Sequence, residues 1–180
     1  MHSFTNTAMV VEVPSTLAAG TYVSYYYDQF FTTNTLGRLI AVSSSSAVAN
    51  WITAYDALGR VASSFQVIGG QSYTFSYSYN LADALTSTTY PSNRVVTTTY
   101  DGANRPSGLS GTLNSMQTQY LADISYAPHG GWAGQTYNRN QMGRLFTYNN
   151  RLQPTEMKDG IPTLNGSTVA SVPNPLLDLQ

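Results

Sequence analysis

The heptapeptide Tyr55-Asp56-Ala57-Leu58-Gly59-Arg60-Val61 returns in degraded form along most of this 180-residue chain. Partial copies of it begin at Tyr27-Asp28, Tyr79-Asn80, Tyr100-Asp101, Tyr126 and Tyr148-Asn149. Successive tyrosines of this series stand 28, 24, 21, 26 and 22 residues apart. Near-equal intervals of this length are typical of repeat proteins, in which each copy buries its apolar face only against its neighbours. The sequence therefore predicts a stacked or spiralling array.

The composition favours sheet over helix. Only 9% of the residues are Asp, Glu, Lys or Arg, against about a quarter in an average protein. Thr and Tyr, which suit strands, are abundant. The clearest alternation runs from Tyr73 to Tyr79, where four aromatic residues would share one face of a strand. Val61–Ile68 precedes it, and Gly69-Gly70 between the two runs predicts a hairpin.

Similar reasoning predicts further strands along the chain. They are Ala84–Tyr90, Arg94–Tyr100, Met116–Tyr126, Trp132–Tyr137, Arg144–Asn149 and Leu152–Lys158. The predicted turns are Pro91–Asn93, Asp101-Gly102, Pro128–Gly131 and Asp159-Gly160. About ten or eleven strands would make a sheet too broad to stay flat. The predicted fold is all-β, with successive antiparallel hairpins in a curved or spiralling sheet.

The repeats suggest a division into three parts. Residues 21–158 would form the hairpin array. Residues 1–20 do not follow the period and are expected to be a cap or a strand donated to a neighbour. Residues 159–180 are expected to be a tail or cap.

The residue after the repeat tyrosine indicates a structural role. Asp28, Asp56 and Asp101 alternate with Asn80 and Asn149 at this position, so charge is not what it requires. Both residue types accept hydrogen bonds from backbone N–H groups and tolerate turn dihedrals, which predicts an Asx-turn at each corner.

Other residues of the motif complete this interpretation. Gly37 and Gly59 would supply a positive φ where the chain enters the next strand. Arg38, Arg60 and Arg105 could stack on a neighbouring tyrosine or bond the aspartate.

Taken together, the Tyr-Asp-Ala-Leu-Gly-Arg-Val motif and the tyrosine-rich strands between its copies resemble the YD repeats of bacterial RHS proteins and teneurins. The resemblance covers roughly Tyr25 to Pro154, or five to six repeats, and is most specific at Tyr55–Val61. It implies β-hairpins that coil into a hollow shell, which in that family often encloses a toxin or serves as an adhesive extracellular module. The copies with lost or inserted residues, at Tyr126–Gly130 and after Asp28, are where regular stacking is least expected. The residues that carry the repeat motif are Tyr27, Asp28, Gly37, Arg38, Tyr55, Asp56, Gly59, Arg60, Tyr79, Asn80, Tyr100, Asp101, Arg105, Tyr148 and Asn149.

Little in the chain points to catalysis or to a cofactor. His2 and His129 are the only histidines, there is no cysteine, and no carboxylates cluster with ligand spacing. We therefore expect no enzyme activity, no metal and no cofactor. A net charge of −1 without basic runs gives no footprint for nucleic acid. No apolar stretch is long enough to span a membrane, and no signal peptide is visible.

Two functions remain open at this point. The first is a structural scaffold, either an extracellular shell-wall segment or a self-assembling filament subunit that joins copies through sheet edges or terminal strands. The second is an adhesin-like module that binds a glycan or a protein through exposed aromatic residues, with Trp51 and Trp132 as the best candidates. The family resemblance implies an extracellular or cell-surface location. Asn165, in the sequon Asn165-Gly166-Ser167, is a candidate glycosylation site.

Overall fold

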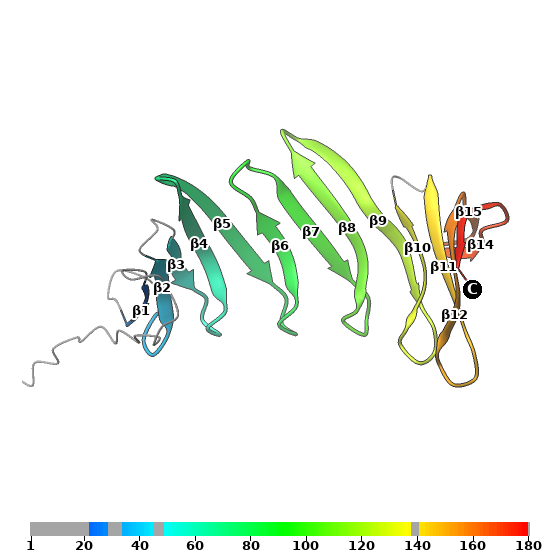
Figure 1. The fold of residues 1–180 in the computed structure, drawn as a ribbon, viewed down its shortest axis with the longest axis horizontal. Helices are drawn as coiled ribbons and strands as arrows, with labels where there is room; N and C mark the ends of the chain where they lie inside the picture. Colours follow the sequence, from blue (N-terminus) through cyan, green and yellow to red (C-terminus); the bar gives the residue numbers. More distant parts are fainter. Residues whose placement is uncertain (1–21, 29–33, 45–48, 138–140, 180) are drawn as a thin grey trace, which may run out of the picture. The chain divides into compact units, whose positions relative to one another are not determined.

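The computed structural model describes residues 22–28, 34–44, 49–137 and 141–179, and every regular element among them is a strand. The predicted segment 1–20 lies outside these residues. Thirteen strands form one sheet in the order β1 to β12 followed by β15, and β13 pairs with β14 separately (Figure 1). The bounds are β1 Val23–Tyr27, β2 Leu39–Ser44, β3 Ala49–Tyr55, β4 Val61–Ile68, β5 Gln71–Tyr79, β6 Leu85–Thr89, β7 Val95–Tyr100, β8 Pro106–Leu113, β9 Met116–Tyr126, β10 Trp132–Tyr137, β11 Met142–Tyr148, β12 Pro154–Gly160, β13 Thr163–Asn165, β14 Thr168–Ser171 and β15 Pro175–Leu179.

The prediction of an all-β protein made of successive antiparallel hairpins is confirmed. The hairpin that joins β4 to β5 turns at Gly69 and Gly70, whose φ values are 57° and 78°. Strands β9 and β10 have the bounds that the sequence predicted. The chain divides into two compact units, one within Met1–Ser78 plus Thr88–Ser92 and the other within Tyr79–Ser87 plus Asn93–Gln180.

Two local predictions were wrong. The sequence did not predict β8, whose residues Pro106–Leu113 include two glycines and two serines. Asp159-Gly160 was predicted to be a turn but forms the end of β12, where Asp159 is only 8% exposed. The expected number of strands was low because β8 was missed and because β13, β14 and β15 lie in the segment that was expected to be a tail or cap.

In the first unit, an aromatic row crosses the sheet on one face. Tyr26 on β1 stacks on Trp51 of β3, with ring centroids 6.0 Å apart, and Trp51 stacks on Phe65 of β4 at 6.1 Å. Ala41 on β2 lies opposite both Tyr26 and Trp51 in the register and is 1% exposed. The small side chain of Ala41 leaves room for the two rings to meet above it. Its neighbour Ile40 is also 1% exposed and points to the other face.

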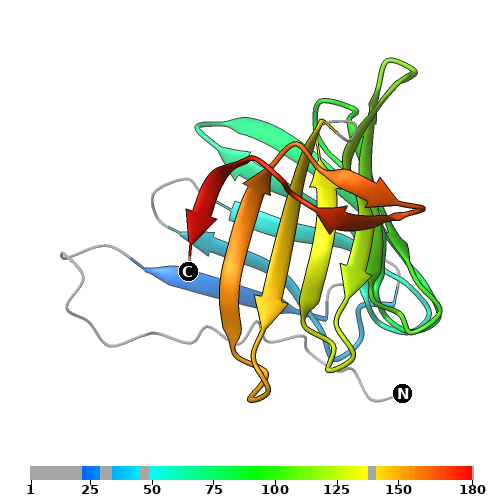
Figure 2. The same cartoon turned by 90° about the vertical axis from the view of Figure 1, so that its right-hand side faces the viewer.

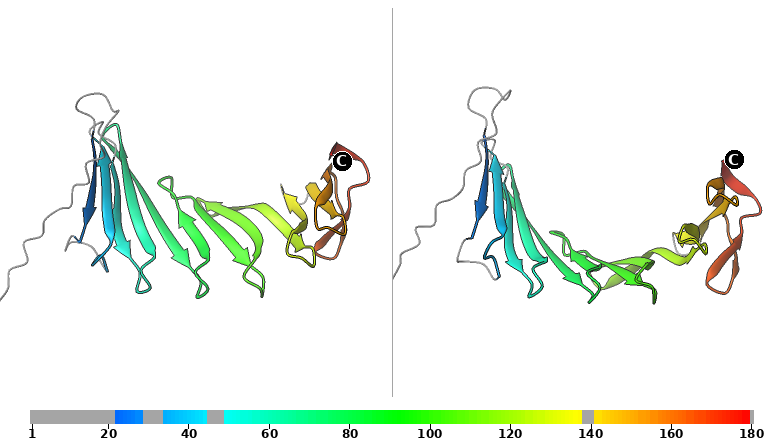
Figure 3. Two further views of the ribbon diagram at one scale, coloured as in Figure 1. Left: turned by 60° about the horizontal axis from the view of Figure 1, so that its bottom comes forward. Right: turned by 90° about the horizontal axis from the view of Figure 1, so that it is seen from below.

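In the second unit, the β13–β14 hairpin packs on β9, β10 and β11 (Figure 2). Figure 3 shows the same hairpin, in orange to red, outside the row of strands. Glycines on the covered strands make the close approach possible. A Cβ atom on Gly143 would lie 2.6 Å from Cβ of Pro162, and one on Gly160 would lie 2.8 Å from Cγ1 of Val172. Residues 159–180 thus contain the end of β12 and three further strands, and their assignment as a cap stays a prediction.

No helix in the described ranges has the length and apolar character that a membrane crossing by a helix would require.

Candidate functional site

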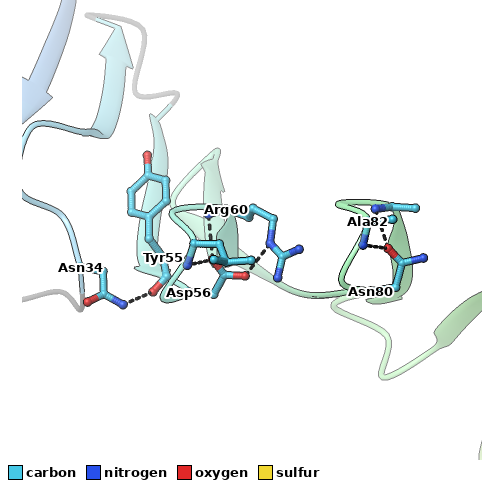
Figure 4. Close-up of polar contacts among 8 residues, drawn as sticks. Asn34, Tyr55, Asp56, Arg60, Asn80 and Ala82 are labelled. Carbon is cyan, nitrogen blue, oxygen red and sulfur yellow. Dashed lines mark hydrogen bonds and ion pairs between the residues drawn. The ribbon is translucent and has the colours of Figure 1, made fainter.

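The corner that follows Tyr55 is built around the side chain of Asp56. Its Oδ1 atom accepts hydrogen bonds from the backbone N–H groups of Leu58 and Arg60, at 3.0 and 2.9 Å (Figure 4). Two backbone bonds close the loop, from Asp56 N–H to the Arg60 carbonyl and from Gly59 N–H to the Asp56 carbonyl. One carboxylate oxygen therefore satisfies two backbone donors that the tight turn would otherwise leave unpaired.

The same geometry recurs at three other corners, with either Asp or Asn at its centre. Asn80 accepts from Ala82 and Ala84, and Figure 4 shows the first of these bonds. The remaining pairs are Asp101 with Ala103 and Arg105, and Asn149 with Arg151 and Gln153. All four side chains accept at offsets of two and four residues. The hydrogen bonds expected of an Asx-turn are thus present whichever of the two residue types occupies the position.

At the Asp56 and Asp101 corners, an arginine four residues on pairs with the aspartate. Arg60 Nε lies 2.7 Å from Asp56 Oδ2, and Arg105 Nε lies 2.8 Å from Asp101 Oδ2. Hydrogen bonding by the Arg60 backbone and side chain holds the pKa of Asp56 below its usual value. The Arg105 side chain and backbone do the same for the pKa of Asp101. Both carboxylates therefore stay ionised and bound to the turn at neutral pH.

We expect Asp56→Asn to lower the denaturation midpoint only slightly and Asp56→Ala to lower it much more. Asparagine keeps the Oδ1 acceptor, and only the charge of the partly buried pair with Arg60 is lost, which water can still screen. Alanine removes the acceptor for two backbone donors. Urea denaturation followed by tryptophan fluorescence measures both midpoints. Equal destabilisation by the two variants would mean that charge, and not the turn bonds, is what the position needs.

The residue four positions after a corner tyrosine has a positive φ at five of the corners. The residues there are Gly59, Asp83, Asn104, Gly130 and Leu152, with φ values of 85°, 62°, 58°, 89° and 64°. Glycine, asparagine and aspartate tolerate this conformation, whereas leucine is strained in it. At the first corner, with its inserted residues, Gly37 takes this role with a φ of 73°.

Leu152→Gly is expected to raise the free energy of unfolding by about 0.5 to 1 kcal/mol. The leucine side chain is 57% exposed, so little burial is lost, while the left-handed strain of an L-residue is relieved. The matched control is Leu81→Gly, at a corner leucine that is 97% exposed and has an ordinary φ, which should be destabilising. Chemical denaturation of both variants measures the difference. Equal losses at the two positions would show that no strain is present at Leu152.

The two irregular copies keep the corner by other means. At Tyr126–Gly130 the Asx residue is replaced by Ala127, yet both loop-closing backbone bonds remain, from Ala127 N–H to the Gly131 carbonyl and from Gly130 N–H to the Ala127 carbonyl. At the first copy, Gly37 N–H donates to Asp28 Oδ1. From the same insertion, Asn34 Nδ2 donates to the Tyr55 carbonyl at 3.0 Å (Figure 4). The loss and the insertion therefore leave these corner contacts in place.

Four of the corner tyrosines link their copy to the previous one through their hydroxyl groups. Each of these hydroxyls donates to a backbone carbonyl in the previous copy. The acceptor is the first residue of the strand that follows the previous corner. The pairs are Tyr55 with Leu39, Tyr100 with Leu85, Tyr126 with Pro106 and Tyr148 with Trp132. In the last three pairs the acceptor stands six residues after the previous corner tyrosine. We call this series of contacts the tyrosine ladder.

Arginine side chains reinforce the ladder at two places. The Arg38 guanidinium carbon lies 5.1 Å from the centre of the Tyr55 ring, and that of Arg105 lies 4.3 Å from the Tyr126 ring. Both are cation–π contacts between successive copies. Gly59 has a second function here, because a Cβ atom at its position would collide with the Arg38 guanidinium. Burial raises the pKa of Tyr55, with the Arg38 charge acting in the opposite direction, so the hydroxyl stays a donor at neutral pH.

Tyr55→Phe is expected to lower the free energy of unfolding by about 1 kcal/mol, the usual net value of one hydrogen bond. Tyr55 is only 8% exposed, so the Leu39 carbonyl gains little access to water when its donor is removed. Tyr73→Phe, at a tyrosine that is 41% exposed, is the control and should change stability by less than about 0.5 kcal/mol. Thermal and urea denaturation both report the difference. A neutral Tyr55→Phe would show that the ring alone, without its hydroxyl, connects the copies.

The other candidate residues are placed as follows. Trp51 has ring neighbours in Tyr26 and Phe65, so packing in the aromatic row accounts for its position. Trp132 is 38% exposed and contacts Tyr126 edge-on. His129 contacts the Tyr148 ring, with centroids 4.5 Å apart. Asn165 is exposed at the tip of the β13–β14 hairpin. In the part of the chain that the structure describes, no three His, Cys, Asp or Glu residues gather as metal ligands would.

Sequence reasoning found the corner residues but missed the ladder and the bidentate charge pair of Arg144 and Asp159. Arg144 Nε and Nη2 donate to the two oxygens of Asp159 at 2.7 and 2.6 Å. The two residues are 15 positions apart and meet only because β11 pairs with β12, so no local motif could reveal them. In three of the four ladder contacts the acceptor stands six residues after the previous corner tyrosine, but it is a backbone carbonyl, so no side chain marks it in the sequence.

Comparison with solved structures gives several close likenesses in fold. The crystal structure of TcdB2-TccC3-TEV matches with a TM-score of 0.66 at 14% identity, over 76% of this chain and 8% of that one. The crystal structure of TcdB2-TccC3 matches with a TM-score of 0.63 at 14% identity, over 89% of this chain and 10% of that one. The Photorhabdus luminescens Tc holotoxin pore matches at 0.60 and 15% identity, over 79% and 9% of the two chains.

Neither a family model nor a curated protein matches the sequence. The chain spans a tenth or less of the length of these three structural neighbours. At this level of identity the likeness concerns the fold. Together with the recurring Tyr-Asx corners, it shows that this chain has the antiparallel β-hairpin array of the YD-repeat, or RHS-type, fold.

Proposed function

We propose that this chain is a non-catalytic scaffold built of YD repeats. The observation that carries this proposal is the tyrosine ladder, in which four contacts of one kind each attach a copy to the one before it. Contacts that repeat along an array stabilise an extended structure. They do not bring several polar groups together at one point. Catalytic and cofactor sites need convergent polar groups in a concave setting.

The chemistry of the motif residues supports the same conclusion. The carboxylates of Asp56 and Asp101 are engaged by the turn and by arginine. Their pKa values are lowered, which is opposite to what a general acid at neutral pH would need. The two carboxylates that could act as catalytic groups thus stabilise the corners instead.

The scaffold would act as a segment of an extracellular shell wall or as a subunit that assembles with copies of itself. The fold resemblance supports a wall segment, since the structural neighbours named above belong to TcdB2-TccC3 and Tc holotoxin structures and are far longer than this chain. Self-assembly is supported by the sheet itself, whose terminal strands have backbone groups suited to pairing with another copy. The proposed extracellular or cell-surface location has its support in the family resemblance alone.

Negative-stain electron microscopy of the purified chain, with light scattering at micromolar concentration, tests this function. We expect elongated particles or shell fragments whose size grows with concentration. Discrete particles of monomer mass at every concentration would contradict the self-assembling form. Turnover of a substrate, abolished by a substitution of a motif residue such as Asp101→Asn, would contradict the non-catalytic role.

Binding of a glycan or protein is the second candidate, and exposed Trp132 is the observation that favours it. The residue is 38% exposed and contacts Tyr126, whose ring also contacts the Arg105 guanidinium. Aromatic rings of this kind can stack on sugars or on apolar side chains. A glycan array probed with the chain and with Trp132→Ala tests this candidate, which requires binding that the substitution removes.

A further inference from the structure

The tip of the β13–β14 hairpin holds the single Asn-Gly pair of the sequence, Asn165-Gly166. Both residues are exposed, and a Cβ atom added at Gly166 would meet no atom beyond its chain neighbours within 4 Å. The Asn165 carbonyl accepts a hydrogen bond from the Thr168 hydroxyl at 2.8 Å. No described residue hydrogen-bonds the side-chain amide of Asn165. The amide can therefore turn toward the backbone nitrogen that follows it.

An asparagine in this setting can lose its amide nitrogen without an enzyme. The backbone nitrogen of Gly166 attacks Cγ of Asn165, its proton passes through water to Nδ2, and the Cγ–Nδ2 bond breaks to release ammonia. The product is a five-membered succinimide ring, which water opens at either carbonyl to give aspartate or isoaspartate. Water is the only co-reactant. A following glycine favours ring closure, because it has no Cβ to crowd the ring and its backbone adopts more conformations.

Two aspartates also precede a glycine, at Asp101-Gly102 and Asp159-Gly160, and could form the same ring with loss of water. The fold holds both of them. Asp101 accepts hydrogen bonds from two backbone N–H groups and from the Arg105 side chain. Asp159 binds Arg144 through both of its oxygens. Bonds of this kind keep Cγ away from the next backbone nitrogen, and the side chain of Asn165 has none.

The hairpin that carries Asn165 is short enough to open at its tip. Strand β13 has three residues and β14 has four, and they form a two-stranded sheet of their own. Hairpins of two strands are only marginally stable by themselves, so this one depends on its packing against β9, β10 and β11. Asn165 and Thr168 are its last pair before the turn. Local opening there costs far less than global unfolding and gives the backbone of Asn165 the freedom that ring closure needs.

We propose that Asn165 is a site of spontaneous deamidation, and that the isoaspartate product releases the β13–β14 hairpin from the sheet. This covalent change accumulates with the age of the chain and does not depend on the proposed scaffold function. Isoaspartate runs the main chain through the side-chain carbon, so it adds one backbone atom before Gly166. A two-residue hairpin turn sets the register of its strands, and an added atom there displaces the pairing of residues 165 and 168.

The register matters because the hairpin fits closely onto the strands that it covers. Val169 of β14 is 6% exposed, and a Cβ atom on Gly134 of β10 would lie 3.1 Å from Cβ of Val169. Val172, directly after β14, is 4% exposed and lies against Gly160. A slip by one residue turns every side chain of a strand to its other face, so Val169 would leave this contact and meet water. Aspartate, the other product, keeps the natural backbone and should leave the hairpin in place.

Peptide mapping by mass spectrometry tests the site, after incubation of the full chain at mildly alkaline pH. The internal control is Asn114, an exposed asparagine that precedes Ser115 in the turn between β8 and β9. Asn165 is expected to deamidate about tenfold faster than Asn114 or more, because serine has the Cβ that glycine lacks. A rate at Asn165 that is no higher than at Asn114 would overturn the site.

The variant Ser115→Gly separates the effect of the sequence from that of the fold. It gives Asn114 a following glycine, at a position where φ is already 64°, in a hairpin whose two strands belong to the main sheet. Asn165 should still react several times faster than Asn114 in this variant, because the β13–β14 tip opens more easily. Equal rates at the two positions would overturn the contribution of the short hairpin.

Hydrogen exchange tests the release of the hairpin. In the isoaspartate form, isolated by ion exchange, the amide hydrogens of β14 are expected to exchange about tenfold faster than in the natural chain, while those of β4 and β5 stay unchanged. Freshly purified Asn165→Asp adds the charge but keeps the backbone, so it should exchange like the natural chain. Asn165→Gln lacks the five-membered ring route and should not change on incubation. Unchanged exchange in the isoaspartate form would overturn the release, and fast exchange in Asn165→Asp would overturn the role of the added backbone atom.

Discussion

Asp159→Ala is expected to lower the free energy of unfolding by about 2 to 3 kcal/mol. Asp159 is 8% exposed and accepts two hydrogen bonds from Arg144 in a bidentate pair. Its removal leaves the guanidinium without a partner inside the sheet, and breaking a buried pair in this way usually costs about 3 to 5 kcal/mol. The Arg144 side chain is 34% exposed, so water can compensate part of the loss. Urea denaturation at neutral pH measures the change.

The same pair predicts a dependence of stability on pH. The Arg144 hydrogen bond is the main reason that the pKa of Asp159 lies below its usual value, and burial opposes it. The folded state therefore holds the proton less tightly than the unfolded state does. The stabilisation is complete above the unfolded pKa and is lost as the pH falls through the folded one.

Asp159→Asn is the matched variant for this pH test. It keeps the volume of the side chain but cannot titrate. We expect its stability to fall less steeply than that of the natural chain as the pH drops below about 4. Some slope should remain, since Asp56 and Asp101 also have lowered pKa values. Parallel curves for the two proteins would show that Asp159 does not contribute to acid sensitivity.

Ile40→Ala is expected to lower the free energy of unfolding by about 3 kcal/mol. Ile40 is 1% exposed and is one of the two largest side chains that are fully buried among the described residues. Truncation of a buried isoleucine removes apolar contacts and leaves a cavity, at a typical cost of about 2 to 5 kcal/mol. Few other side chains are buried to this extent, so each has a larger share of the stability.

Leu36→Ala is the control for this prediction. Leu36 lies shortly before β2 and is 85% exposed, so its truncation should change stability by less than about 0.5 kcal/mol. Differential scanning calorimetry of both variants gives the comparison. A loss below 1 kcal/mol for Ile40→Ala would show that the strands around it close on the cavity.

Much of the fold could be predicted because the copies of the motif can be compared with one another. The exchange of Asp and Asn at the corners excluded charge as the requirement, and the hydrogen bonds of Asp56 and Asn80 have the same offsets. The hairpin at Gly69-Gly70 carries its turn signal in adjacent residues. In both cases the residues that determine the turn lie within a few positions of it, so the turn can be predicted from the sequence.

The prediction missed β8 and placed a turn in β12 because the residues that explain these segments lie on other strands. In β8, a Cβ atom on Gly111 would collide with the ring of Tyr120, so glycine is needed for packing and does not mark a turn. In β12, Asp159-Gly160 has the composition of a turn, but Arg144 binds the aspartate and Val172 covers the glycine. Leu152 shows the converse, since its positive φ is imposed by the corner and no property of leucine signals it.

The acceptors of the tyrosine ladder have a consequence for how such arrays grow. Every hydroxyl in the ladder bonds a main-chain carbonyl, on residues as different as Leu39, Pro106 and Trp132. Since all amino acids supply that group, a newly duplicated copy finds its docking point already present, whatever side chains its predecessor has acquired. Gene duplication can therefore lengthen the protein without compensating substitutions, and older copies are free to diverge in sequence while the array persists.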